Sequence, residues 1–192
     1  MYILFEGIDT TGKSTQIELL KNRFPQYIYT KEPGGTDFGI KAREILLEAK
    51  LTSKRAELLL FLADRAEHYR EIIYKNRDNT IISDRGFLSG IGYALANGDF
   101  EFDKLLELNR FALEDNLPDK IVLFTTNIDT LKKRMGEKSL DGIEKRGLEY
   151  LIRVQEFMIN SLKKLEIDYI LIDSTTNSIS QIQDMVESYI EN

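Results

Sequence analysis

The 192-residue sequence contains no cysteine, so disulfide bonds and thiolate metal sites are excluded. No apolar run approaches the ~20 residues that a membrane-spanning helix needs, and no membrane association is expected. The first apolar run, Tyr2–Phe5, begins directly after Met1 and leaves no room for a cleaved signal peptide. We therefore expect the protein to reside in the cytoplasm.

An excess of positive charge is also absent. The chain has 26 Lys and Arg residues against 32 Asp and Glu residues, for a net charge of −6. A broad nucleic-acid-binding surface would be basic, so we expect no nucleic-acid polymer as partner, although a mononucleotide needs only a local cluster of cations. The hydrophobic content of 42% and the length are typical of one globular domain with a sizeable core, and we predict a single domain over residues 1–192.

Proline is scarce, and the three prolines all fall between predicted elements. The predicted strands are short apolar runs, at Tyr2–Phe5, Tyr27–Tyr29, Ile81–Ile82, Ile121–Phe124 and Tyr169–Ile172. Amphipathic stretches predict helices over Lys13–Phe24, Ile40–Ala49, Glu57–Tyr74, Phe87–Ala96, Phe102–Glu114, Leu131–Met135, Ile143–Leu165 and Ile179–Ile190. This alternation predicts an α/β fold, a doubly wound five-stranded parallel sheet with helices on both faces, whose ligands bind at the carboxyl ends of the strands.

Residues 7–14 read Gly-Ile-Asp-Thr-Thr-Gly-Lys-Ser and directly follow the first apolar run. They match the phosphate-binding P-loop, G-x-x-x-x-G-K-[ST], between a buried strand and a helix. Gly7 and Gly12 let the backbone curl so that its N–H groups converge on one anion. Lys13 is expected to reach the β- and γ-phosphates, and the Ser14 hydroxyl to ligate Mg²⁺. The sequence therefore predicts nucleotide binding.

Two further segments offer a substrate site. Phe61 and Arg65 lie one helical turn apart, where an aromatic ring and a guanidinium could read a planar base. The alternative is that Phe61 belongs to the core and Arg65 is exposed. The segment Glu32-Pro33-Gly34-Gly35 at the end of the second strand allows close backbone approach, or is an ordinary strand-to-helix turn.

Asp84 and Arg85 end the third predicted strand. A carboxylate there is where P-loop proteins place a second acid linked to Mg²⁺, and Arg85 can clamp a phosphate. The alternative is a surface ion pair between the two. A basic segment over residues 134–146 breaks at Gly136 and predicts a short mobile lid, or else a solvated charged loop. His68, the single histidine, is expected to be structural.

Taken together, four blocks of the sequence resemble the thymidylate kinase family of the nucleoside-monophosphate kinases, over nearly the whole length. The blocks are Phe5 to Thr15; Glu32-Pro33-Gly34-Gly35-Thr36 with Arg43; Phe61 to Arg65; and Asp84-Arg85 with Ser89, Gly90 and Tyr93. The resemblance implies a P-loop kinase that transfers the γ-phosphoryl group of ATP to dTMP, giving dTDP and ADP for dTTP biosynthesis, with Mg²⁺ arriving with ATP. It also implies a homodimer.

By that resemblance, Phe61 stacks on thymine and Arg65 contacts its O4 edge, while Arg43 and Arg85 hold the acceptor phosphate. Tyr93 packs beside the sugar, and Asp9 contacts the 3′-OH region. The implied dTMP-binding residues are Asp9, Pro33, Arg43, Phe61, Arg65, Arg85, Gly90 and Tyr93. The implied ATP-binding residues are Gly7, Ile8, Asp9, Thr10, Thr11, Gly12, Lys13, Ser14, Thr15 and Arg134, with Arg134 packed on adenine. Ser14 and Asp84 are the expected metal-linked residues.

The sequence departs from the family at Gly86, Ala94 and Thr10, the last replacing a P-loop Arg of some members. The missing cation must then come from the lid, and we predict that Lys138 supplies it. The expected catalytic residues are Asp9, Lys13, Arg85 and Lys138. Two rival functions remain, a deoxynucleoside kinase and a regulatory GTPase. The two acceptor-phosphate arginines argue against the first, and the lack of an Asn-Lys-x-Asp segment argues against the second.

Overall fold

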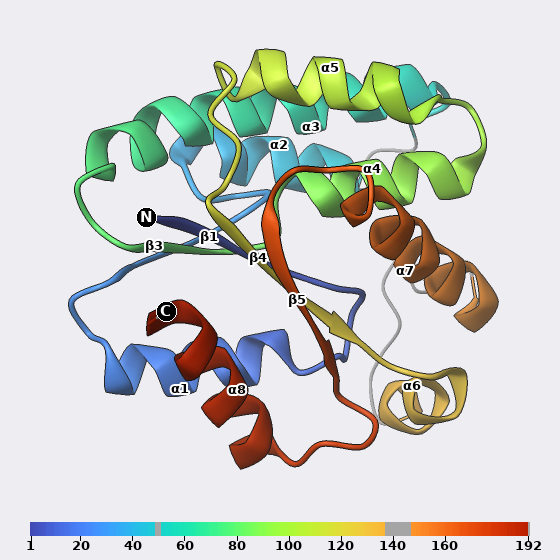
Figure 1. Cartoon of the computed structure of the whole chain (residues 1–192). Helices are drawn as coiled ribbons and strands as arrows, with labels where there is room; N and C mark the ends of the chain where they lie inside the picture. Colours follow the sequence, from blue (N-terminus) through green and yellow to red (C-terminus); the bar gives the residue numbers. More distant parts are fainter. Residues whose placement is uncertain (49–50, 137–146, 192) are drawn as a thin grey trace.

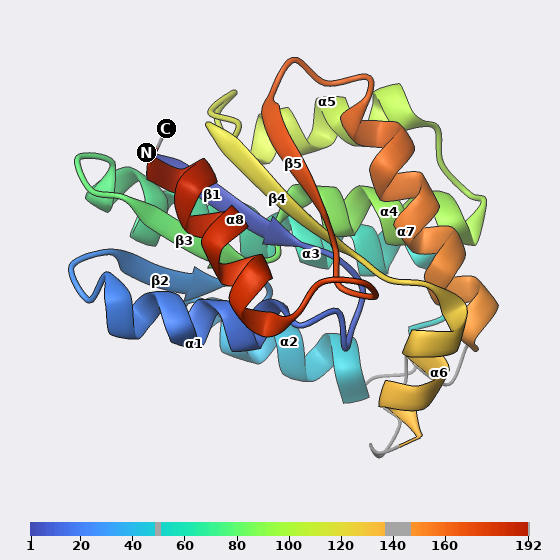
Figure 2. The same ribbon diagram turned by 60° about the horizontal axis from the view of Figure 1, so that its bottom comes forward.

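A parallel five-stranded sheet forms the centre of the computed structural model, which describes residues 1–48, 51–136 and 147–191. The strands are β1 (Tyr2–Glu6), β2 (Ile28–Lys31), β3 (Ile81–Asp84), β4 (Lys120–Thr125) and β5 (Asp168–Asp173). Their order across the sheet is β2-β3-β1-β4-β5, and every pair is parallel (Figure 1; β2 is labelled in Figure 2). Each predicted strand is found, and the predicted fold class is confirmed.

The helices follow the predicted order, with shifted boundaries. They are α1 (Lys13–Arg23), α2 (Asp37–Glu48), α3 (Lys54–His68), α4 (Phe87–Asn97), α5 (Phe102–Ala112), α6 (Ile128–Met135), α7 (Leu148–Leu162) and α8 (Ile179–Glu191). After α3 the chain continues through a π turn (Tyr69–Ile73) and a 3₁₀ turn (Tyr74–Asn76). The first residues of the predicted helix over 143–165 lie outside the described residues.

Three helices begin earlier than the sequence pattern predicted, because a polar side chain caps each of them. The hydroxyl of Thr36 accepts from Gly39 N at 2.9 Å, and that of Ser53 accepts from Ala56 N at 3.3 Å. Asn127 Oδ1 accepts from Thr130 N at 2.8 Å. Such caps satisfy backbone donors of the first helical turn. The sequence pattern placed the starts at Ile40, Glu57 and Leu131, three residues after the observed starts, and missed the preceding caps.

Helices cover both faces of the sheet, as predicted. α1 and α8 lie on one face, while α3, α4, α5 and α7 lie on the other (Figure 2). Side chains of β1 alternate between them, with Ile3 and Phe5 in the α1–α8 layer and Leu4 in the opposite layer. The central strand β1 is buried throughout and β3 and β4 are buried except at their ends, whereas edge strands β2 and β5 are partly exposed. In the described ranges, no helix is long and apolar enough to cross a bilayer.

The strand register sets the position of the binding edge. Asp84 lies opposite both Phe5 of β1 and Lys31 of β2. The segments that follow β1, β2 and β3 therefore emerge side by side at the carboxyl edge of the sheet. These segments are the P-loop, the turn that begins at Glu32, and Arg85.

Candidate active site

The P-loop joins β1 to α1, and its glycines are required by the backbone. Gly7 has φ 140°, and a Cβ there would lie 2.5 Å from the carbonyl oxygen of Phe124. Gly12 has φ 95° and is the N-cap of α1. Side chains at such φ values are strained, so these two positions favour glycine. The loop thereby brings its backbone N–H groups to the helix N-terminus, a ready anion site.

Lys13 curls back over this loop. Its Nζ donates to Gly7 O at 2.7 Å and to Ile8 O at 2.9 Å, and the side chain is buried. Burial lowers the pKa of Lys13 to about 7, and the nearby Arg85 guanidinium acts in the same direction. The carboxylates of Asp84 and Asp9 act against that shift. The buried ammonium group of Lys13 is thus poorly stabilised in the free protein. A bound phosphate would supply negative charge and favour the protonated lysine.

A cavity of about 550 Å³ opens in front of the P-loop. Its lining residues include Asp9 to Gln16, Lys31, Glu32, Arg43, Asp84, Arg85, Arg134 and Ser174. The structure therefore brings the predicted phosphate-binding loop together with the arginines predicted to bind the acceptor phosphate and adenine. A volume of this size fits the range of small-ligand pockets.

Arg85 lies in the short connection between β3 and α4, and its side chain contacts the P-loop. Its φ of 71° is unusual for a non-glycine residue. Nη1 donates to Gly7 O at 2.8 Å and to Ser89 Oγ at 3.3 Å, and Nη2 pairs with the Asp9 carboxylate. Burial alone would lower the pKa of Arg85, but Asp9 and other neighbouring groups raise it. Arg85 thus pairs with Asp9, and the alternative of a surface ion pair between Asp84 and Arg85 is wrong.

Asp84 and Ser14 fit the predicted metal-linked roles. Both line the cavity in front of the P-loop. Asp84 Oδ1 is buried and has no hydrogen-bond partner in the part of the chain that the structure describes. An orphaned carboxylate oxygen beside a phosphate site suits a hydrated Mg²⁺. The described residues contain no cluster of three or more His, Cys, Asp or Glu side chains that could hold a metal without nucleotide.

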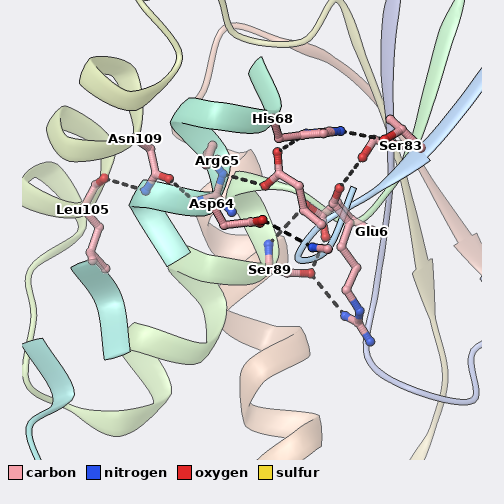
Figure 3. Close-up of polar contacts among 12 residues, drawn as sticks. Glu6, Asp64, Arg65, His68, Ser83, Ser89, Leu105 and Asn109 are labelled. Carbon is pink, nitrogen blue, oxygen red and sulfur yellow. Dashed lines mark hydrogen bonds and ion pairs between the residues drawn. The ribbon is translucent and has the colours of Figure 1, made fainter. Parts of the chain in front are cut away.

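Arg65 is buried, so the exposed alternative for this residue is wrong. Its Nε donates to Glu32 Oε2 at 2.8 Å, and its Nη1 donates to Asn109 Oδ1 at 2.6 Å (Figure 3). Phe61, one turn earlier on α3, is half-buried and therefore not part of the closed core. A Cβ at Gly90 would lie 3.4 Å from Arg65 Nη1, so the predicted base-side residues of α3 and α4 are neighbours.

The predicted substrate residues fall into two groups. Phe61, Arg65, Gly90 and Tyr93 do not line the cavity in front of the P-loop. Asp9, Arg43 and Arg85 do line it. Glu32 connects the two groups, because it lines that cavity and also accepts a hydrogen bond from Arg65. Arg43 is exposed on α2 but turns toward the turn after β2, where its Nη1 donates to Pro33 O at 3.2 Å.

Arg134 ties α6 to the loops at the carboxyl edge. Its Nη1 donates to Thr10 O at 2.9 Å and to Ser174 Oγ at 3.0 Å, and its Nη2 donates to Ser174 O at 2.8 Å. These bonds hold the guanidinium beside the P-loop. Helix α6 ends before Gly136. The rest of the predicted lid, including Lys138, lies outside the described residues.

Sequence reasoning missed three polar residues behind the site. Glu6 is fully buried and accepts from Ser89 Oγ and from Ser89 N, the latter at 3.2 Å. Burial raises the pKa of Glu6 above its ordinary value, although Ser89 and Arg85 act the other way. Glu32 and Asn109 hold Arg65. The positions of Glu6 and Glu32, shortly after predicted apolar strands at the binding edge, could have indicated that they lie near the site. Nothing in the sequence around Asn109 indicated its contact with Arg65.

Comparisons with known proteins agree on one family. The family model described as thymidylate kinase matches residues 5–186. A thymidylate kinase of Sulfurovum sp. (strain NBC37-1) is 63% identical over 191 residues, covering 100% of both chains. One from Sulfurimonas denitrificans is 50% identical over 188 residues, covering 98% of each. The crystal structure of thymidylate kinase from Ehrlichia chaffeensis superposes with a TM-score of 0.79 at 26% identity, covering 100% of this chain and 98% of that one.

Proposed function

The chain belongs to the thymidylate kinase family, and from this premise we propose which of its residues bind and transfer the phosphoryl group. The enzyme transfers the γ-phosphoryl group of ATP to dTMP, giving dTDP and ADP. The observation that carries the assignment of residues is one cavity that is lined by the P-loop, Arg43 and Arg85 together. Such a cavity could hold the γ-phosphate of ATP at the P-loop and the phosphate of dTMP at the two arginines, next to each other.

On the donor side, the backbone N–H groups of residues 7–15 and the N-terminus of α1 bind the ATP phosphates. Lys13 leaves its two carbonyl partners and donates to the β- and γ-phosphates. Arg134, held by Thr10 O and Ser174, offers its guanidinium face to adenine. Ser14 and Asp84 would hold Mg²⁺, which when bound with the nucleotide neutralises charge on the phosphate oxygens.

On the acceptor side, Arg85 and Arg43 hold the dTMP phosphate in line with the γ-phosphoryl group. A guanidinium can donate two parallel hydrogen bonds to a phosphate, which sets its orientation as well as its position. Asp9 limits the movement of Arg85 and lies where the sugar 3′-OH region is expected. Phe61 stacks on the base and Arg65 donates to O4, with Tyr93 beside the sugar and Pro33 and Gly90 as the remaining contacts. Positioning of this kind accounts for most catalysis of phosphoryl transfer.

A homodimer in the cytoplasm completes the proposal. Helices α2 and α3 pack together and carry large apolar side chains that are exposed in the single chain, among them Ile40 at 50% and Leu59 at 60%. An isologous interface would cover such residues. Sedimentation equilibrium tests this directly, because Leu59→Glu should convert a dimer to a monomer, and a wild-type monomer would contradict the dimer.

A coupled assay of ADP release tests the function and separates the rivals. ATP and Mg²⁺ should give ADP only when dTMP is added, with one ADP for each dTDP. Turnover of thymidine in place of dTMP would indicate a deoxynucleoside kinase. Hydrolysis of GTP without an acceptor would indicate a GTPase. Omission of Mg²⁺, or its removal with EDTA, should abolish the transfer.

A further inference from the structure

Arg65 is held by a buried carboxylate that faces two partners at once. Glu32 Oε2 accepts from Arg65 Nε at 2.8 Å, and Glu32 Oε1 lies 2.7 Å from His68 Nδ1. Arg65, Glu32 and His68 are all nearly inaccessible to solvent, with side-chain exposures of 3%, 3% and 0%. Burial alone would raise the pKa of Glu32, but Arg65 and His68 together hold it below its ordinary value. The carboxylate is therefore ionised and can only accept hydrogen bonds.

The histidine links this carboxylate to the sheet. Because Glu32 only accepts, His68 Nδ1 carries a proton and donates to it, while Nε2 shares a hydrogen bond of 2.7 Å with the hydroxyl of Thr30. Thr30 belongs to β2 and His68 ends α3. The carboxylate is thus held directly by two residues of α3, and through His68 by the strand that precedes it.

A second helix holds the other end of the guanidinium. Asn109 on α5 donates its own amide to Leu105 O at 2.7 Å, which turns its Oδ1 toward Arg65 Nη1. The described residues offer no hydrogen-bond acceptor to Arg65 Nη2. A Cβ at Gly90 would lie 3.4 Å from Nη1 and 3.5 Å from Nη2. Two of the three nitrogens are therefore fixed, while the third remains available on the side that faces α4.

We propose that Glu32 and Asn109 are positioning residues, which orient Arg65 so that its remaining donors select a base with an acceptor at position 4. The proposal rests on the proposed role of Arg65 in reading the thymine edge. An arginine side chain has many rotamers, and an anchored guanidinium loses less freedom on binding. Anchoring also gives selectivity. A rigid donor faces the amino group of dCMP, donor against donor, whereas a loose arginine can turn away and tolerate it.

The measurement is the ratio of kcat/KM for dTMP to kcat/KM for dCMP. Glu32→Gln keeps the shape of the side chain but removes its charge, and it should lower the ratio about tenfold, the effect expected for a hydrogen bond to a charged group. KM for ATP should stay unchanged. Asn109→Ala should lower the ratio as well, whereas Asn109→Asp keeps an acceptor for Nη1 and should retain it. Asp119→Asn is the matched control, since Asp119 accepts from Tyr2 N at 2.6 Å, far from the proposed site, at the strand end opposite the binding edge.

Arg65→Ala separates this inference from the role on which it rests. If Arg65→Ala lowers the ratio but Glu32→Gln and Asn109→Ala do not, the positioning role is overturned and the reading of the base by Arg65 stands. If Arg65→Ala itself leaves the ratio unchanged, the base-reading role fails and the inference fails with it. A fall in ATP affinity or thermal stability without a change in the ratio would make both residues merely structural. Should Glu32→Gln fail to fold, the comparison of Asn109→Ala with Asn109→Asp decides the question.

Discussion

The two halves of the proposed site, the donor half for ATP and the acceptor half for dTMP, are built in different ways. The main part of the donor half is nine contiguous residues, 7–15, whose backbone is proposed to bind the phosphates, and Arg134 is added from α6. The acceptor half gathers arginines from α2, α3 and the end of β3, elements far apart in the chain. The halves meet at Gly7, whose carbonyl accepts from both Lys13 and Arg85. A contiguous loop carries its own geometry, whereas long side chains from distant elements need partners that hold them.

Buried acids supply that support on the proposed acceptor side. Arg65 is held by Glu32, and Arg85 donates to Ser89, which in turn donates to Glu6. Glu6 ends β1 and Glu32 follows β2, so both acids lie at the carboxyl edge of the sheet, with β3 between their strands. A buried charge is costly unless it is paired and hydrogen-bonded, so each acid and its partners depend on one another. The acceptor half should therefore be the more easily disturbed by distant substitutions.

Replacing Arg85 should give the largest effect and confine it to the acceptor half. Arg85→Ala removes the proposed phosphate clamp, and we expect kcat/KM for dTMP to fall by about a thousandfold, the scale of losing an arginine at a transferred phosphoryl group. ATP affinity, measured by calorimetry, should change little. Arg85→Lys should recover only part of the rate, because a lysine lacks the fork. Equal losses in ATP affinity and dTMP turnover would place Arg85 on the donor side instead.

Removing the ring of Phe61 should weaken dTMP binding alone. Phe61→Ala is expected to cost roughly 1–3 kcal/mol of dTMP binding free energy, as for other stacks between a base and an aromatic side chain. Calorimetric titration with dTMP measures it. Phe111→Ala serves as the control, because Phe111 is 85% exposed on α5 and away from the site. Unchanged dTMP affinity in Phe61→Ala would contradict stacking.

Lys13 should make ATP binding depend on pH, which tests the donor half. A phosphate beside the ammonium group favours its charged form, so ATP binding should raise the pKa of Lys13 from about 7 and take up a proton. Between pH 7 and pH 8 the free lysine loses its proton, and ATP affinity should fall by about fivefold. Titrations in buffers of different ionisation enthalpy measure the uptake.

Lys13→Arg provides the control for that titration, since arginine stays protonated throughout this range. Proton uptake should disappear in this variant, and the pH dependence of its ATP affinity should flatten. Equal proton uptake in wild type and Lys13→Arg would show that the proton goes to another group.

The smallest expected effect is at Gly90. A Cβ there would lie 3.4 Å from Arg65 Nη1, an ordinary van der Waals contact, so Gly90→Ala adds a methyl group beside the guanidinium without removing any bond. We expect about a threefold rise in KM for dTMP, the low end of an overpacking effect, and no change in KM for ATP. Steady-state kinetics measures both constants. A larger change in KM for ATP than in KM for dTMP would contradict the assignment of Gly90 to the acceptor half.

The sequence by itself determined the sheet, the helix order and the position of the P-loop to which the donor half is assigned. Apolar runs and amphipathic stretches are local signals, and the P-loop motif is contiguous, so all of them could be read directly. Helical spacing singled out Arg65 and the end of the third predicted strand singled out Arg85, while the resemblance to a family supplied the expected roles of both and of Arg43. Helix starts at Thr36, Ser53 and Asn127 were missed by a few residues, because a cap precedes the apolar pattern.

Only the tertiary structure decided what holds the arginines. Spacing on α3 favoured an exposed Arg65, yet packing of α3 against β2 and α5 buried it between Glu32 and Asn109. Asp84 and Arg85 are neighbours in sequence, but Arg85 pairs with Asp9 instead. These partners are separated by between 33 and 76 positions along the chain. No local pattern encodes such pairs, because they arise only when strands and helices come together around the same edge of the sheet.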